Sequence, residues 1–300
     1  MFALAGFLLG LVLGSFVKVL ADRSLNGKSF WGRSFCLTCK KNLRFYDLFP
    51  IFSYLFTLGK CRYCKKKISW EYPLVEIVIG ILVGYLFFQT FKNFQFSIFN
   101  FQFLNLVLNF IYKLFFICIL AALFITDLKK MFIPDRIIIP AIKIGFGLSL
   151  FVTFYKVSYF YFFLKNTTLG KYLLPPNSDY FLRHALYSAI PFLTGVLMAI
   201  LIGGFFYFLI FITKGKGMGG GDVKLGAFIG LMLGFPQALI VLILSFLTGA
   251  IFSIILIILR KKHFGQTIPF GPFLVTGSLL TLFWGDQILN WYLRMSLVHN

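Results

Sequence analysis

Long apolar stretches alternate with short polar segments along the whole chain, and this pattern predicts a helical membrane protein. Several apolar runs are ~17 to 25 residues long, the length that an α-helix needs to cross a hydrocarbon core of ~30 Å. We place eight spans on this pattern, at residues 2–20, 72–90, 105–126, 137–155, 186–212, 223–233, 236–259 and 269–293. The predicted fold is an all-α polytopic membrane protein of about eight transmembrane helices.

Two of the predicted spans depart from the usual form. Residues 2–20 could be mistaken for a signal peptide, but no basic segment precedes the apolar core and no small-x-small cleavage site precedes polar sequence. We therefore expect a retained first helix. The sixth span, residues 223–233, is too short to cross a bilayer comfortably, and Pro236 is expected to end or kink it.

The composition agrees with this pattern and adds a strong positive charge. Of the 300 residues, 59% are hydrophobic and 13% are charged, whereas a typical soluble domain is ~25% charged. The formal net charge of +20 could suggest a nucleic-acid partner. However, the positive-inside rule and anionic lipid headgroups explain the basic connecting segments, so we predict membrane lipids and no nucleic acid as partners. These segments are residues 21–70, 127–136, 213–224 and 260–263.

The same charges predict an orientation in the membrane. Residues 21–70 carry eleven Lys and Arg and fall on the same side as the other basic segments when the spans alternate. This side is predicted to be cytoplasmic, with both termini outside. Residues 91–104 and 156–185 then become extracytoplasmic loops. The predicted parts are a first transmembrane helix (1–20), a small cytoplasmic domain (21–71) and a membrane domain of seven further helices (72–300).

Four cysteines form two CxxC pairs between the first and second spans. "CLTC" carries Cys36 and Cys39, and "CRYC" carries Cys61 and Cys64, with 21 residues between the pairs. Two such knuckles supply four thiolates for one tetrahedral Zn²⁺. Because protein ligands fill all four positions, the site would be structural. The alternatives are two disulfides, which a cytoplasmic location disfavours, and four unconnected thiols.

The chain has only nine acidic residues, so the position of each is informative. An ionised acid at the centre of a bilayer costs ~2.5 kcal/mol or more on insertion scales. Asp127 ends the third span and Asp222 begins the sixth, and both are predicted at the cytoplasmic edge. Two carboxylates that share one proton can divide the roles of acid and base, the ionised one activating water. The alternatives are helix capping by Asp222 and interfacial ion pairs of Asp127 with nearby lysines (Lys129, Lys130, Lys224).

Three consecutive glycines, Gly219, Gly220 and Gly221, precede Asp222. Glycine lets the backbone approach a substrate closely and adopt conformations closed to other residues. An extended peptide could then add main-chain hydrogen bonds beside Asp222. We therefore predict substrate contacts at these glycines and at Lys224.

The other acids are weaker candidates for chemistry. Glu76 lies inside the second span, where a carboxylate is costly, so it is expected to be neutral or paired, with either a functional or a structural role. Asp135 is expected to cap or turn into the fourth span. Four further acids are expected to be solvated or locally paired (Asp22, Asp47, Asp179, Asp286).

Taken together, these motifs resemble the type IV prepilin peptidases, membrane aspartyl proteases of the GxGD type. The resemblance runs in the family's order through "GSFVKVLADR", "CLTC", "DLFPIFSYLFTLGKCRYCKKKISWEYPLVE", "DLKKMFIPD", "GMGGGDVKL" and "IPFGPFL". It implies eight spans, a cytoplasmic zinc-type loop and two catalytic aspartates, which fall on Asp127 and Asp222. Such enzymes remove the short basic leader from prepilins and pseudopilins after a glycine, at the cytoplasmic face of the bacterial plasma (inner) membrane.

The resemblance also implies a second activity. Many members of this family methylate the new N-terminus with S-adenosylmethionine, and the knuckle-bearing loop is associated with that bifunctional type. Three positions depart from the family's pattern: Lys18 stands where Asn is usual, Glu71 stands where Arg is common, and "CLTC" lacks the usual Pro after its first Cys.

Two functions of other classes compete with the peptidase hypothesis. A non-catalytic membrane scaffold or assembly factor that docks through the zinc loop would tolerate Asp222→Asn and fail on loss of Cys36 or Cys61. A transporter is a third possibility, because acids near spans can mark ion pathways. It is disfavoured because the two prominent acids fall at one face and no inverted repeat is evident.

Overall fold

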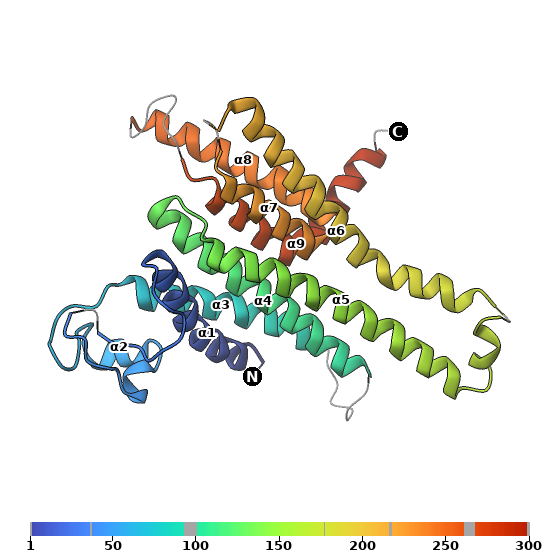
Figure 1. Cartoon of the computed structure of the whole chain (residues 1–300), viewed down its shortest axis with the longest axis horizontal. Coiled ribbons are helices and arrows are strands. Elements are labelled where there is room, and N and C mark those ends of the chain that lie inside the picture. Colours follow the sequence, from blue (N-terminus) through green and yellow to red (C-terminus); the bar gives the residue numbers. More distant parts are fainter. Residues whose placement is uncertain are drawn as a thin grey trace. The chain divides into compact units, whose positions relative to one another are not determined.

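A computed structural model describes residues 2–36, 38–92, 101–176, 178–215, 218–260 and 268–298. Within these residues the chain forms nine α-helices and two 3-10 helices and no β-strand (Figure 1), which confirms the predicted all-α fold. Eight of the nine α-helices lie at the predicted spans. They are α1 (Phe2–Leu25), α3 (Glu71–Phe91), α4 (Phe101–Lys130), α5 (Asp135–Asn166), α6 (Tyr180–Thr213), α7 (Gly220–Leu233), α8 (Gln237–Ile258) and α9 (Gly271–Val298).

Among the described helices, six are long and apolar enough to cross a membrane, namely α1, α3, α4, α5, α6 and α8. The other two predicted spans are also helices, α7 with 14 residues and α9 with 28. At a rise of ~1.5 Å per residue, α7 is too short to span the hydrocarbon core, as its sequence predicts. The chain is a multi-pass membrane protein.

Several helices extend beyond the predicted spans. Much of the segment 156–185, which we expected to be a loop, is helical, because α5 continues to Asn166 and α6 begins at Tyr180. Aromatic contacts join these two helix ends: the ring of Phe160 stacks on Phe181 at 6.2 Å and lies 4.0 Å from the ring of His184. Such contacts stabilise helix beyond the length that a bilayer requires. The other predicted loop, 91–104, falls largely on residues 93–100, which lie outside the described residues.

The chain divides into two compact units, and each is described by itself. Unit 1 is Met1–Ser97 with Lys113–Pro134, and unit 2 is Ile98–Tyr112 with Asp135–Asn300. Unit 1 therefore holds α1, α3, the C-terminal part of α4 and the short helices η1 (Phe45–Leu48) and α2 (Phe52–Phe56). Helix α4 contributes residues to both units.

In unit 1, α1 and α3 pack at very close range. A Cβ on Gly10 would lie 2.7 Å from the Cα of Gly80, and a Cβ on Gly14 would lie 2.7 Å from the Cα of Glu76. Only glycine permits this approach, which is the small-xxx-small packing typical of membrane helices. This glycine spacing was not among the features predicted from the sequence. The contact sets the register of the α1 residues that follow Gly14, including Lys18.

In unit 2, the short helix α7 forms much of the core. Leu225, Phe228 and Ile229 are buried, and α7 packs against α5 and α6. The phenol of Tyr112 donates a hydrogen bond to the carbonyl of Met232 at 3.0 Å, which satisfies one carbonyl in the last turn of α7. This burial explains why the sequence after Asp222 is almost wholly apolar in a helix too short to span the bilayer.

Candidate active-site residues and metal centre

The four predicted ligand cysteines come together in unit 1. Their Sγ atoms all lie within 4.8 Å of one another, and the Sγ atoms of Cys36 and Cys64 are 3.8 Å apart. Zinc–sulfur bonds of ~2.3 Å in a tetrahedron place the sulfurs about 3.8 Å apart, so the cluster fits one such ion. The cysteines are free thiols, which is contrary to the disulfide alternative. The set is Cys36, Cys39, Cys61 and Cys64.

Both cysteine pairs are built on the same backbone turn. The N–H of Cys36 donates to the carbonyl of Lys41 at 3.0 Å, and the N–H of Lys40 donates to the carbonyl of Cys36 at 2.9 Å. The same two bonds recur in the second knuckle at 2.8 and 2.9 Å (Cys61, Lys65, Lys66). The sequence matches this shared geometry, since residues 36–41 and 61–66 both read C-x-x-C-K-K.

Two of these thiols have very different pKa values because their surroundings in the two turns differ. Burial raises the pKa of Cys36, but backbone hydrogen bonds from Cys39 and Thr38 outweigh it and set that pKa at about 6. A backbone hydrogen bond from Lys66 lowers the pKa of Cys64, but burial and the neighbouring thiols raise it to about 11. A metal ion bound here would therefore have to displace protons, as at other thiolate sites.

Glu76 attaches the cysteine-rich segment to the membrane helices. Its side chain is buried on α3 and accepts a hydrogen bond from the backbone N–H of Ile51 at 2.8 Å. Of the two roles considered for Glu76, functional and structural, this contact supports the structural one. Within the segment, Asp47 accepts a bond from the Tyr63 hydroxyl at 3.0 Å and pairs with Arg62 at 3.1 Å, so it is locally paired as expected.

Asp127 lies in the last turn of α4, in unit 1. The residue is only 6% exposed, and its backbone carbonyl accepts the N–H of Met131 at 2.8 Å. Met131 has a φ of 47°, the left-handed conformation that commonly ends a helix. The carboxyl group is therefore carried by a helix end, as the sequence predicts.

Asp222 lies in the first turn of α7, in unit 2. The N-cap of α7 is Gly219, and the backbone N–H of Asp222 donates to the carbonyl of Gly219 at 3.1 Å. Asp222 is thus the third residue of the helix, and the capping alternative is wrong. At this position the helix dipole stabilises a negative charge. The side chain is partly buried.

The glycines before Asp222 have ordinary backbone conformations. Gly219 is extended, with φ −91° and ψ 154°, and neither Gly220 nor Gly221 is among the positive-φ residues. Our expectation of conformations closed to other residues is therefore wrong, because the last two glycines already belong to α7. However, Gly219 and Gly220 are exposed, and a Cβ on either would meet no atom within 4 Å. The surface beside this backbone is open.

Lys224 links the start of α7 to the start of α5. Its Nζ lies 2.5 Å from an oxygen of Asp135, the first residue of α5. The side chains are 40% and 57% exposed, and pairs of such exposure contribute ~1 kcal/mol or less to stability. Lys224 is therefore accessible to a ligand while it is paired.

The lysines considered as partners of Asp127 have bonding partners of their own. Lys129 pairs with acids on α1 and α3, and Lys130 donates to the carbonyl of Leu25 at 3.0 Å. The described structure thus gathers the four cysteines with Asp127 in unit 1, and it places Asp222, the glycines and Lys224 in unit 2.

These features define a class of protein. It is a multi-pass helical membrane protein with a Cys₄ metal-type centre, one carboxylate at the end of a membrane-spanning helix and another at the start of the short helix α7. The chain belongs to the type IV leader peptidase family. The model of that family matches residues 114–254, and the model described as the bacterial peptidase A24 N-terminal domain matches residues 8–90. The family expected from the sequence is confirmed, and the protein is a membrane peptidase.

Curated relatives cover nearly the whole chain. A prepilin leader peptidase/N-methyltransferase of Aeromonas salmonicida is 32% identical over 87% of this chain and 74% of its own length. The protein of the same name from Bacillus subtilis is 30% identical over 97% of this chain and 98% of its own. That of Pseudomonas aeruginosa is 28% identical over 98% and 94%. No solved structure gives a significant match.

Proposed function

We propose that this protein removes the leader from type IV prepilins and pseudopilins and methylates the new N-terminus. The observation that carries this proposal is the similarity to prepilin leader peptidase/N-methyltransferases along almost the full length of both chains. The proposed cleavage follows a glycine, at the cytoplasmic face of the bacterial inner membrane. Cleavage of a prepilin in liposomes by the native protein and by Asp127→Asn and Asp222→Asn variants tests the proposal, with mass spectrometry to detect both cleavage and methylation.

In the proposed mechanism, Asp127 and Asp222 act together on one water molecule. The ionised carboxylate takes a proton from the water as its oxygen attacks the scissile carbonyl carbon. The protonated carboxyl group donates a hydrogen bond to the carbonyl oxygen, which stabilises the tetrahedral intermediate. The C–N bond then breaks, and the leaving amine receives a proton from the acid that took one from water. The helix dipole at the start of α7 favours Asp222 as the ionised partner.

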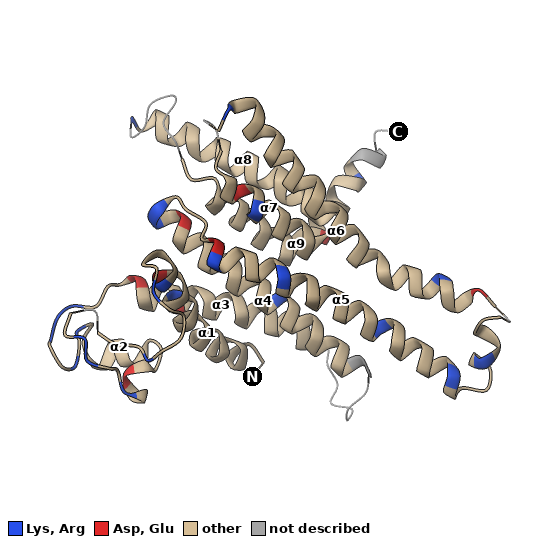
Figure 2. Ribbon diagram, in the orientation of Figure 1, with Lys and Arg blue, Asp and Glu red and all other residues tan. Residues whose placement is uncertain are grey.

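Electrostatic attraction between enzyme and leader does not explain binding in this proposal. Figure 2 shows Lys and Arg gathered in the segment between α1 and α3, and the proposed leaders are basic as well. Both would be held at the anionic lipid surface and would meet in two dimensions. Docking then depends on the apolar pilin helix and on main-chain contacts at the open glycine backbone.

We propose Zn²⁺ as the ion of the cysteine cluster. The residues that would hold it are Cys36, Cys39, Cys61 and Cys64, and the ion would fix the two knuckles without taking part in peptide cleavage. S-adenosylmethionine, when bound, would supply the methyl group that the new α-amino group takes up. We assign no residues to its site.

Alanine at the open glycines is expected to weaken cleavage. In Gly219→Ala and Gly220→Ala the new methyl group enters the space through which the substrate backbone is proposed to pass, so KM is expected to rise. The thermal midpoint of Gly220→Ala is expected to stay unchanged or to rise, because alanine favours helix over glycine by up to ~1 kcal/mol. Gly219 is the extended N-cap of α7, where glycine is preferred to alanine, so Gly219→Ala is expected to lower the midpoint slightly. Gly204→Ala on α6 is the matched control, since a Cβ there also meets no atom within 4 Å. If the Gly219 and Gly220 variants had the native KM, these residues would not be part of the substrate site.

A pair of variants separates the two roles open to Lys224. If its ammonium group contacts the substrate, Lys224→Met raises KM, whereas Asp135→Asn frees the ammonium group and leaves KM near the native value. This is the outcome we expect, because the pair is exposed and weak. Steady-state cleavage kinetics on both variants provide the measurement. Equal effects of the two substitutions would instead show that Lys224 serves only to join α7 to α5.

A further inference from the structure

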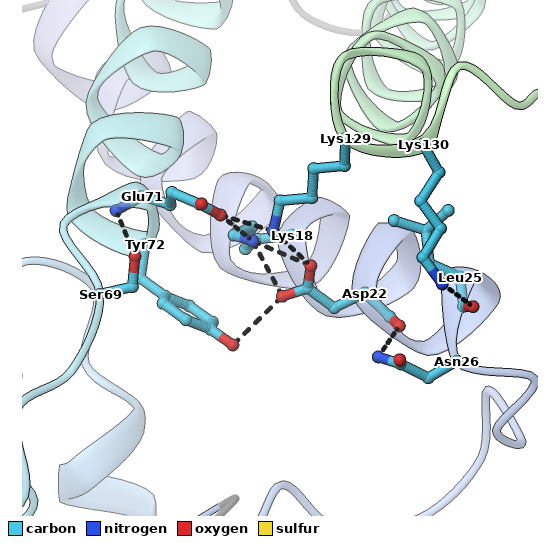
Figure 3. Close-up of polar contacts among 9 residues, drawn as sticks. All are labelled: Lys18, Asp22, Leu25, Asn26, Ser69, Glu71, Tyr72, Lys129 and Lys130. Carbon is cyan, nitrogen blue, oxygen red and sulfur yellow. Dashed lines mark hydrogen bonds and ion pairs between the residues drawn. The ribbon is translucent and has the colours of Figure 1, made fainter.

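A charged cluster joins α1, α3 and the end of α4 in unit 1 (Figure 3). We call it the Lys18 cluster, and its members are Lys18, Asp22, Glu71, Tyr72 and Lys129. Lys18 is only 1% exposed, and its Nζ lies 2.9 and 2.8 Å from the two carboxylate oxygens of Asp22 and 2.9 Å from Glu71. Two lysines balance two carboxylates, so the cluster is neutral.

Lys129 is the member that α4 contributes. Its Nζ lies 3.1 Å from Asp22 on α1 and 2.5 Å from Glu71 on α3. The phenol of Tyr72 donates a hydrogen bond to the other oxygen of Asp22 at 3.1 Å. In Figure 3 the side chains of Lys18 and Lys129 converge on the same two carboxylates. One ammonium group thus holds the end of α4 to both neighbouring helices.

The burial of Lys18 at the centre of this cluster argues for a geometric role. A buried ion pair is often no more stabilising than apolar side chains of similar volume, because desolvation offsets the attraction. Removing one partner, however, leaves an uncompensated charge and is strongly unfavourable. Such a cluster enforces one arrangement of its helices more than it raises their stability.

Within unit 1, polar side chains join the last turn of α4 to α1 and α3, while apolar side chains farther back in α4, such as Ile117 and Leu120, are buried. Whereas α1 and α3 pack backbone to backbone through glycines, α4 makes few close backbone approaches to either helix in the described residues. Side chains from the last turn of α4 bridge the distance. Lys129 reaches two carboxylates, and Lys130 reaches the carbonyl of Leu25.

Asp127 belongs to the same last turn, two residues before Lys129. Residues two apart lie on nearly opposite sides of a helix, since each residue advances ~100°. Anchoring Lys129 to α1 and α3 therefore fixes the rotation of the turn and, with it, the direction of the Asp127 side chain. We infer that Lys129, held by Asp22 and Glu71, is the residue that positions Asp127 for catalysis. This inference rests on the proposed function of Asp127.

The test uses full-length protein in liposomes with a prepilin substrate and reads two quantities. Lys129→Met is expected to lower kcat by ~10- to 100-fold, because a misplacement of about 1 Å can cost that much, while KM stays near the native value. Hydrogen–deuterium exchange of the amides at 126–131 is expected to rise. Lys129→Arg should restore much of the native kcat and much of the native protection from exchange, since a guanidinium can bridge two carboxylates. Lys130→Met is the matched control, with a much smaller effect on kcat, because among the described residues that lysine bonds a neutral backbone carbonyl and pairs with no carboxylate.

Each outcome distinguishes this inference from the proposed function. If Lys129→Met cleaves at the native rate while Asp127→Asn is silent, the positioning role is overturned and the proposed function stands. If Asp127→Asn itself cleaves, the proposed catalytic role of Asp127 fails, and the exchange data still report whether Lys129 holds the turn. Should Lys129→Met not fold, Glu71→Gln removes one of its two carboxylate partners at a half-exposed position and should lower kcat in the same direction. Native kcat in Glu71→Gln would then overturn the inference.

Discussion

Replacing either Asp127 or Asp222 by Asn is expected to lower the rate of prepilin cleavage by ~10⁴-fold or more, the size of effect seen when one member of a catalytic unit is removed. An amide has nearly the shape of a carboxyl group, so both helix ends should be retained. It can neither take a proton from water nor give one to a leaving amine. The measurement is single-turnover cleavage in liposomes, at matched membrane levels of each protein.

The double variant gives a sharper result than either single one. Because the two acids are proposed to act as one unit, Asp127→Asn/Asp222→Asn should cleave no more slowly than the slower single variant. Asp179→Asn is the control: this acid precedes α6, makes no side-chain cap bond and should leave the rate unchanged. Multiplicative effects of the two Asn substitutions would mean that the acids act independently.

The proposed protonation states also fix the shape of the native pH profile. At low pH both carboxyl groups are protonated and neither can activate water. At high pH both are ionised and neither can donate a proton, so kcat/KM should be bell-shaped. The scaffold alternative makes an opposite prediction for the variants: function would survive Asp222→Asn and fail on loss of Cys36 or Cys61.

Loss of one ligand cysteine is expected to unfold the knuckle segment. Apart from the metal-type centre, this segment has little core, since neither η1 nor α2 has a buried residue. Binding of a structural Zn²⁺ contributes ~10 to 16 kcal/mol of apparent free energy in small zinc domains. Cys61→Ser should therefore bind no zinc and become sensitive to protease within residues 26–70, while the membrane helices persist.

The fifth cysteine provides a matched control for that experiment. Cys118 lies in α4, away from the cluster, so Cys118→Ser should keep one zinc ion per chain and native resistance to protease. Elemental analysis of the purified proteins measures the zinc, and limited proteolysis with mass spectrometry locates the cuts. One zinc per chain in Cys61→Ser would show that the cluster is not a four-thiolate site.

Apolar length was enough to predict the helices, because a bilayer demands ~20 apolar residues from each span. It could not predict their ends. The extension of α5 and α6 depends on contacts between Phe160 and residues more than twenty positions later, which no local pattern reveals. The cluster of the four cysteines, in contrast, could be predicted from a local pattern, because binding one tetrahedral ion requires the same CxxC spacing in both turns.

The candidate site was predicted unevenly. Residue type and position singled out Asp127 and Asp222 among nine acids, but not the helical position of Asp222 or the ordinary conformation of Gly219. The Lys18 cluster was missed because its pairs join residues as far apart as Lys18 and Glu71, which lie 53 positions apart in sequence. The structure pairs these two residues at 2.9 Å.

The central claim is that Asp127 and Asp222 act on one water molecule, and disulfide trapping tests it most directly. Two carboxyl groups that share a proton lie about 3 Å apart, and cysteines can be bridged where their Cα atoms are within ~7 Å. The account predicts that an Asp127→Cys/Asp222→Cys protein in liposomes forms this link on mild oxidation, identified by mass spectrometry, whereas Asp127→Cys/Asp179→Cys does not. Absence of the 127–222 link, with both new thiols reactive toward a maleimide, would contradict the account.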